Sequence, residues 1–182
     1  MKADMLDAVI QFWFHDIAPA SWWKVDAEFD RLIVERFSVL HAQALDCGLF
    51  EWRAAPKGRL AEIIVLDQFS RNMFRSDPRA FAADRLALAL AQEAVAAGAD
   101  HALSPEERVF LYMPFMHSES ARIHEVAERL FKALGQPGNY DFELRHKAII
   151  DQFGRYPHRN ATLGRQSTQE ELAFLAKPGS SF

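Results

Sequence analysis

Apolar residues recur at intervals of three and four along almost the whole chain, and no stretch shows the alternation that is typical of a strand. The pattern predicts an all-α protein of about eight helices. Short connections between successive helices indicate antiparallel neighbours in an irregular bundle or solenoid. The expected ranges, in chain order, are residues 4–14, 25–46, 57–71, 77–98 with a break, 104–113, 118–134, 141–155, and a short helix from 167 or 168.

Local signals set the expected helix ends. Ser104 and Glu107 have the spacing of a capping box, with a proline at the first helical position. Pro114 disfavours helix in the residue before it, so we expect that helix to stop near Met113. Residues 137–139 predict a turn. Ser167 or Thr168, with Glu170 and Glu171 as capping-box partners, is the expected start of the last helix. No linker or low-complexity segment interrupts the chain, and we expect a single domain spanning residues 1–182.

One sequence block occurs twice: an aliphatic residue, Asp-Gln-Phe, any residue, then Arg. Asp67 and Arg71 in the first copy, and Asp151 and Arg155 in the second, lie four residues apart and can pair on a helix. The helix around the first copy is apolar nearly all round, which is typical of a central, buried helix. We expect the two copies to meet. Two interpretations stay open: buried Asp–Arg pairs that tie helices together, or a polar cavity that binds a ligand.

Other polar side chains extend this prediction. Glu119 falls on the apolar stripe of the helix at 118–134, so we expect it to point inward, toward an arginine at position 71, 155 or 159. His117 adjoins it. His158 and Arg159 follow a proline and lie on a predicted loop, where ligand-binding residues are common. The candidate ligand-binding residues are Asp67, Arg71, His117, Glu119, Asp151, Arg155, His158 and Arg159.

Metal and cofactor sites find little support in the sequence. Glu143 and His146 have the Glu-x-x-His spacing of carboxylate-bridged iron helices, but the second motif of that architecture is missing. No phosphate loop, dinucleotide fingerprint or Gly-x-Ser-x-Gly motif occurs. We therefore expect no metal and no cofactor, although the chain contains these possible ligands: His117, Glu119, His124, Glu143, His146, Asp151 and His158.

Composition narrows the class of protein further. The net charge is −4 with acids and bases interspersed, so we expect no binding to nucleic acid. Fifteen Phe and four Trp predict an aromatic-rich core. The single cysteine, Cys47, excludes an intramolecular disulfide. No run approaches the ~20 apolar residues of a membrane helix, and the first residues are acidic where a signal peptide is basic. We expect a soluble, cytoplasmic protein.

Four blocks taken together resemble the bacterial domain-of-unknown-function family 924. They are FWF at 12–14, LDQFSRN at 66–72, YMPFMHSE at 112–119 and FGRYPHRN at 153–160, and the similarity covers nearly the whole chain. The resemblance implies an all-helical fold similar to tetratricopeptide-like superhelices. It implies no established activity, substrate or cofactor, so it transfers no catalytic residue.

Three hypotheses of function follow, and the sequence leaves open whether the protein is an enzyme. The first is a binding module whose polar pocket, lined by Arg, His and Glu, holds an anionic small molecule or peptide. The second is a hydrolase in which Glu119 or Asp151 acts as base, His117 or His158 as its acid–base partner, and arginines as electrostatic clamps. The third is an interaction scaffold whose groove binds a protein partner.

Overall fold

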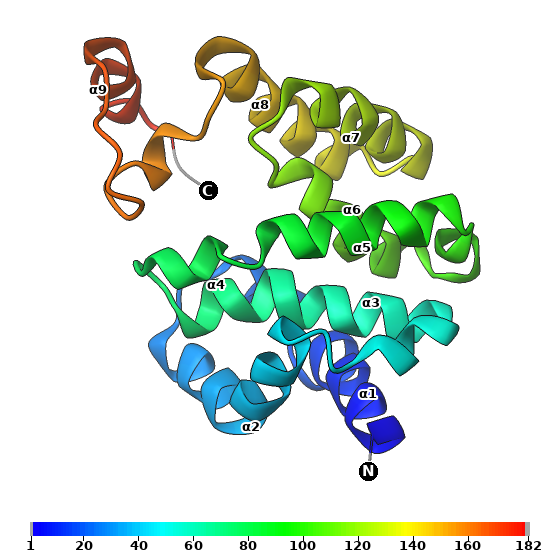
Figure 1. The fold of residues 1–182 in the computed structure, drawn as a ribbon. Helices are drawn as coiled ribbons and strands as arrows, with labels where there is room; N and C mark the ends of the chain where they lie inside the picture. The colour runs from blue at the N-terminus through cyan, green and yellow to red at the C-terminus, as the bar shows by residue number, and fades with distance from the viewer. Residues whose placement is uncertain (1, 181–182) are drawn as a thin grey trace. The chain divides into compact units, whose positions relative to one another are not determined.

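A computed structural model describes residues 2–180, and these residues form helices and connecting turns with no strand among them (Figure 1). The chain divides into two compact units. The N-terminal unit comprises residues 79–114 and the chain up to residue 75; the C-terminal unit comprises residues 76–78 and the chain from residue 115. The all-α prediction is confirmed, whereas a single domain and a tetratricopeptide-like superhelix stay predictions.

The N-terminal unit holds most of the helices. Its long α3, the π-helical turn η4 and α4 follow one another without a gap and form one continuous helix. The elements are α1 (Lys2–Gln11), η1 (Phe12–Asp16), η2 (Pro19–Trp23), α2 (Ala27–Leu45), η3 (Phe50–Ala54), α3 (Pro56–Ile64), η4 (Val65–Phe69), α4 (Ser70–Met73), α5 (Asp84–Ala96) and η6 (Ala99–Ala102). The short η5 (Pro78–Phe81) and α6 (Pro105–Met116) contain residues of both units.

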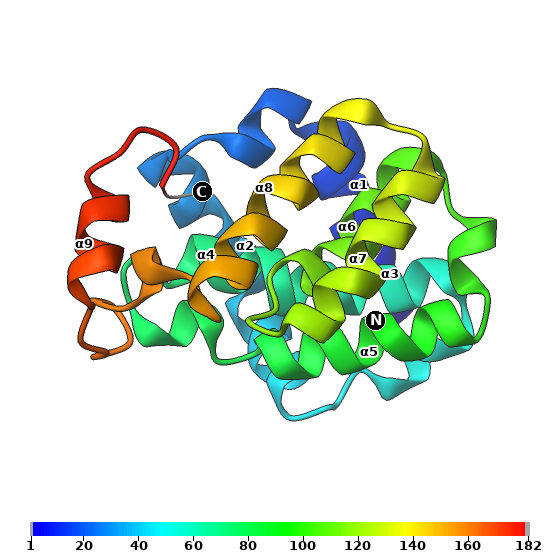
Figure 2. The ribbon, with the colours of Figure 1, turned by 90° about the horizontal axis from the view of Figure 1, so that it is seen from above.

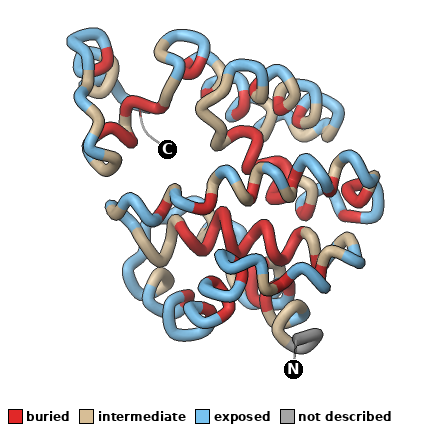
Figure 3. Tube along the Cα trace, viewed as in Figure 1, coloured by how far each residue is buried: buried red, intermediate tan, exposed pale blue. Residues whose placement is uncertain are grey.

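The continuous helix from α3 to α4 is the core element of its unit. Ile64, Val65 and Leu66 are fully buried, and buried positions run along this helix in Figure 3. It packs against α1, α2 and α5. The rings of Phe37 and Phe69 lie 4.8 Å apart within a larger aromatic cluster. The predictions of a central buried helix and an aromatic-rich core are both confirmed, because a helix that is apolar all round must be covered on every side.

The C-terminal unit is built on a helical hairpin. The helices α7 (Ala121–Leu134) and α8 (Pro137–Phe153) pack along each other and are joined by a short connection through Gly135 (Figures 1 and 2). The turn η7 (Pro157–Arg159) and α9 (Gln169–Leu175) follow. The side chain of Thr168 caps α9 in a capping box with Glu171, as the sequence predicts.

Two boundaries that were predicted from prolines are wrong. Helix α6 continues through Pro114 to Met116, because residues on both sides of the proline are buried and their packing outweighs the local cost. Helix α8 begins at Pro137, where a turn was expected. Proline suits the first position of a helix, whose N–H would have no partner within the helix. In the part of the chain that is described, no helix is long and apolar enough to cross a membrane.

Candidate functional site

The first repeated block lies in the N-terminal unit and forms the expected ion pair. Arg71 Nη1 lies 3.0 Å from Asp67 Oδ1, and Gln68 Nε2 donates to Asp67 Oδ2 at 2.6 Å. Asp67 is fully buried. Arg71 also lies 3.0 Å from Asp84, a partner that the sequence did not suggest. Because the carboxylates of Asp67 and Asp84 both pair with the Arg71 guanidinium, these three residues tie η4 and α4 to α5.

The second block lies in the C-terminal unit, and its predicted Asp–Arg pair is wrong. Asp151 is exposed and accepts a hydrogen bond from Lys147 Nζ at 2.6 Å. Arg155 instead donates to both carboxylate oxygens of Glu171, at 2.6 and 2.9 Å. The cause is Gly154, which ends α8 in the left-handed conformation (φ 67°) and directs Arg155 away from the helix. Since the two blocks belong to different units, the expectation that they meet stays a prediction.

Glu119 lies before α7 rather than on its apolar stripe, and its cation is not one of those expected. Arg165 Nη1 and Nη2 donate to its two oxygens at 2.6 and 2.8 Å, and the Tyr156 N–H donates at 2.8 Å. Burial alone would raise the pKa of Glu119, but Arg165, the Tyr156 N–H and the charge of Arg159 lower it below its usual value. Glu119 therefore stays ionised and links the start of α7 to the segment after η7.

Tyr156 is the centre of the polar groups in the C-terminal unit. It is fully buried, and it packs with Ile149 and Ile150 of α8. The Arg159 guanidinium lies 4.6 Å from the centre of its ring. Three imidazole rings surround it at centroid distances of 6.3, 5.8 and 5.5 Å, and belong to His124, His146 and His158. We call Tyr156, Arg159, these three histidines and His117 the Tyr156 cluster.

Two of the eight predicted residues, His158 and Arg159, contact the Tyr156 ring, and His117 adjoins them. Arg159 is buried and donates from Nη2 to the His117 carbonyl at 3.1 Å. The 3₁₀ turn η7, which Pro157 begins, places His158 and Arg159 on the ring. The sequence analysis did not include His146 or Tyr156 among the ligand-binding residues. The Glu-x-x-His spacing marked His146, but only as a possible metal ligand.

Behind the ring lies a buried pair, His124 and Glu143, with Nδ1 and Oε1 2.8 Å apart. His124 Nε2 donates to the Ser118 carbonyl at 2.8 Å and lies 3.2 Å from the Tyr156 hydroxyl, which itself donates to the Met116 carbonyl. Burial raises the pKa of Glu143, while His124 opposes that shift. This arrangement holds the Tyr156 ring in place.

The pKa of His146 is strongly perturbed. Burial lowers the pKa to about 3; a hydrogen bond from Nδ1 to the Phe142 carbonyl opposes the shift, and charges at His117, His124 and His158 add to it. His146 is therefore neutral at physiological pH and serves as a hydrogen-bonding group rather than a cation.

The lowered pKa of His146 predicts a loss of stability in weak acid. The folded protein binds a proton at His146 more weakly than the unfolded chain does, so the contribution of this residue to stability is fully present above pH 6.5. That contribution is lost as the pH falls from 6.5 toward 3. In wild type, this residue should lower the free energy of unfolding by up to about 1.4 kcal/mol for each pH unit below 6.5. Urea unfolding between pH 7 and 4.5 should show a shallower slope in His146→Phe.

Two comparisons give this prediction its control. Burial also lowers the pKa of His41 in the N-terminal unit, so some slope should persist in the variant. Exposed His101 offers a matched substitution, and His101→Phe should keep the wild-type slope. An unchanged slope in His146→Phe would contradict the prediction.

In the described part of the chain, the histidines and acids do not assemble into a metal site. Within residues 2–180, no group of three or more His, Cys, Asp or Glu side chains is placed to hold one ion. The three carboxylates among the possible ligands are paired with other side chains: Glu119 with Arg165, Asp151 with Lys147, and Glu143 with His124. What the Tyr156 cluster offers is a guanidinium and imidazole nitrogens around one aromatic ring.

Comparisons with known proteins agree with the sequence resemblance. Residues 9–179 match the family described as "Bacterial protein of unknown function (DUF924)". The chain is similar to a solved structure, the protein of unknown function ATU0120 from Agrobacterium tumefaciens, with 36% sequence identity and a TM-score of 0.92. That similarity covers 97% of this chain and 99% of the other. No curated protein matches the chain, and neither description states an activity.

Proposed function

We propose that the C-terminal unit of this chain, which belongs to the bacterial DUF924 family of proteins of unknown function, is a binding module for an anionic small molecule or peptide. The observation that supports it best is the placement of Arg159 and His158 against the Tyr156 ring, with His117 beside Arg159. Arginine, with five donors in a planar fork, suits carboxylate and phosphate groups, and imidazole adds further donors.

Rigidity of the cluster favours binding. Arg159 is only 6% exposed, and its guanidinium is held between the Tyr156 ring and the His117 carbonyl. Tyr156 is in turn fixed by His124 and by Glu143 behind it. A donor set held in one conformation loses little entropy when a ligand arrives, which improves affinity. The other predicted arginines, Arg71 and Arg155, serve instead in ion pairs with carboxylates.

The hydrolase hypothesis has weaker geometric support. A general base must take up a proton near neutral pH, whereas three donors hold Glu119 and keep its pKa low. Asp151 is exposed and bonded to Lys147. Neither carboxylate is therefore suited to the role assigned to it. The third hypothesis, an interaction scaffold, requires no polar site. It differs from the other two in predicting that no small molecule stabilises the protein.

A thermal-shift screen tests the proposal. Phosphate and citrate at matched ionic strength should raise the melting temperature by about 5–10 °C when present at 100 times their dissociation constant, because binding to the folded state alone adds about 2.7 kcal/mol. Neutral polyols should have no such effect. The shift should disappear in Arg159→Gln and persist in Arg129→Gln, an exposed arginine on α7 that serves as the matched control.

Three outcomes would contradict the proposal. The first is an equal shift in Arg159→Gln and in wild type. The second is stabilisation by a divalent metal that is lost in His117→Ala and His158→Ala, which would favour the hydrolase. The third is no response to anions or metals, which would favour the scaffold.

A further inference from the structure

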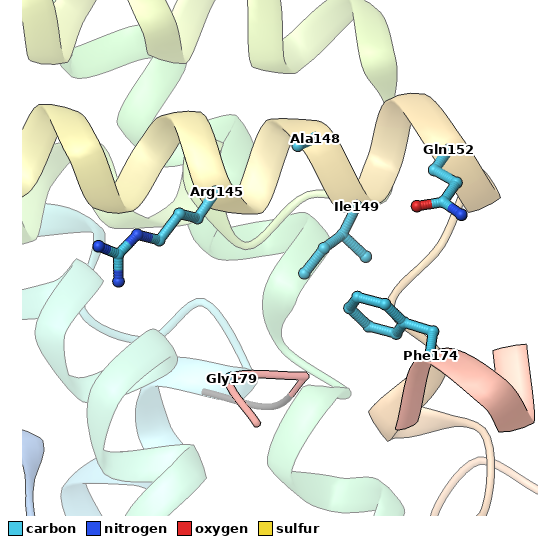
Figure 4. Close-up of a pocket in the computed structure, with 6 residues that line it drawn as sticks. All are labelled: Arg145, Ala148, Ile149, Gln152, Phe174 and Gly179. Atoms are coloured by element: carbon cyan, nitrogen blue, oxygen red, sulfur yellow. The ribbon is translucent and has the colours of Figure 1, made fainter. Parts of the chain in front are cut away.

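A pocket of about 220 Å³ lies on the C-terminal unit (Figure 4). Four of its residues come from α8 at positions i, i+3, i+4 and i+7, so they form one stripe along that helix. A fifth comes from α9 and the last from the segment that follows it. The lining residues are Arg145, Ala148, Ile149, Gln152, Phe174 and Gly179.

The pocket has an apolar middle and a polar group at either end. Ile149 and Phe174 face each other in Figure 4, with Arg145 on one side of them and Gln152 on the other. Arg145 and Gln152 are seven residues apart on α8, which corresponds to about 10 Å along the helix. Ile149 and Phe174 also pack in the hydrophobic cluster of Tyr156, so the floor is firmly supported.

Unlike Arg155 and Arg165, Arg145 has donors available to a ligand. Arg155 and Arg165 are each bonded to a carboxylate. Within the described residues Arg145 forms no salt bridge and no side-chain hydrogen bond, and its guanidinium lies 5.6 Å from the Phe142 ring. Its charge at one end of an apolar pocket favours a ligand with one anionic group and an apolar body.

We propose that this pocket binds a small monocarboxylate whose apolar body is a single aromatic ring or a short alkyl chain. Its carboxylate pairs with Arg145, and the body lies against Ile149 and Phe174. The volume is below the ~300–1,000 Å³ of sites for drug-sized ligands, which limits the ligand to about one ring or roughly six carbons. This site uses none of the residues assigned to the anion-binding cluster, so either proposal can fail alone.

Chemical-shift titration of the ¹⁵N-labelled protein tests the proposal, with benzoate and hexanoate as probes and benzamide and hexanamide as neutral counterparts. The two acids should cause saturable shifts at residues 145–152 and at Phe174. The amides should bind about tenfold more weakly or not at all, because a charge-assisted hydrogen bond contributes more than a neutral one.

Three variants separate this site from its surroundings. Arg145→Gln should weaken binding of the acids about tenfold or more. Ala148→Phe, at an exposed helical position, should fill the pocket and abolish binding while the amide spectrum stays that of a folded protein. Arg129→Gln removes the same charge from α7 and should leave affinity unchanged.

The proposal is overturned by any of three results: equal affinity for acid and amide, wild-type affinity in Arg145→Gln, or no saturable shift at residues 145–152. If Ala148→Phe fails to fold, Arg145→Gln and the acid–amide comparison still decide the question.

Discussion

Asp67→Ala should lower the free energy of unfolding by about 3 kcal/mol, as measured by urea unfolding near pH 7. Breaking a buried ion pair by removing one partner costs about 3–5 kcal/mol because it leaves an uncompensated group in a dry interior. Asp67 is fully buried and bonded to both Arg71 and Gln68. The lower end of the range applies because Asp84 still holds Arg71.

The repeated sequence block supplies a matched control for this prediction. Asp151→Ala changes the same residue in the second copy, but Asp151 is exposed and bonded only to Lys147 within the described residues. Exposed pairs contribute between zero and about 1 kcal/mol, so this variant should be nearly as stable as wild type. Equal losses in the two variants would show that the two copies have equivalent environments, contrary to the structure.

Tyr156→Ala should have an effect of similar size, lowering the free energy of unfolding by about 3–5 kcal/mol. The ring is fully buried and packs with Ile149 and Ile150, while Arg159 and three histidines surround it. Removing it leaves a large cavity that these neighbours cannot fill. Anion binding should be lost as well, because the ring positions the Arg159 guanidinium. Urea unfolding and the thermal-shift assay measure the two effects.

Tyr156→Phe separates packing from hydrogen bonding in the same residue. It keeps the ring but removes the hydroxyl that bonds to the Met116 carbonyl and to His124. The unsatisfied groups should cost about 1–3 kcal/mol. The anion response should persist, since Arg159 still lies over the ring. A variant as unstable as Tyr156→Ala would assign the effect to the hydroxyl and not to packing.

Much of the fold could be predicted from the sequence because its helix signals are local. Periodicity revealed the central helix, and the spacing of Thr168 and Glu171 marked the start of α9. The boundaries at Pro114 and Pro137 were wrong for different reasons. Burial of the side chains around Pro114 lets α6 continue through the proline. Pro137 suits the first position of a helix, so α8 begins there.

The candidate site was less accessible to sequence analysis, because its pairings join distant residues. Arg165 was not predicted as the partner of Glu119, since 46 positions separate them and no local pattern connects the two. The second Asp–Arg pair failed because of one residue, Gly154, whose left-handed conformation ends the helical spacing on which the prediction depended. His158 and Arg159 were predicted on a loop because Pro157 is a local signal, and the structure places them on the 3₁₀ turn η7.

The central claim is that the C-terminal unit binds an anion at Arg159. The most direct measurement is a chemical-shift titration of the ¹⁵N-labelled protein with phosphate and with citrate, following the Arg159 Nε–Hε signal and the imidazole signals of His117 and His158. We expect saturable shifts at these groups in wild type and in Arg129→Gln, and none at the two histidines in Arg159→Gln. Shifts that never saturate, or that saturate elsewhere and leave Arg159 unchanged, would contradict it.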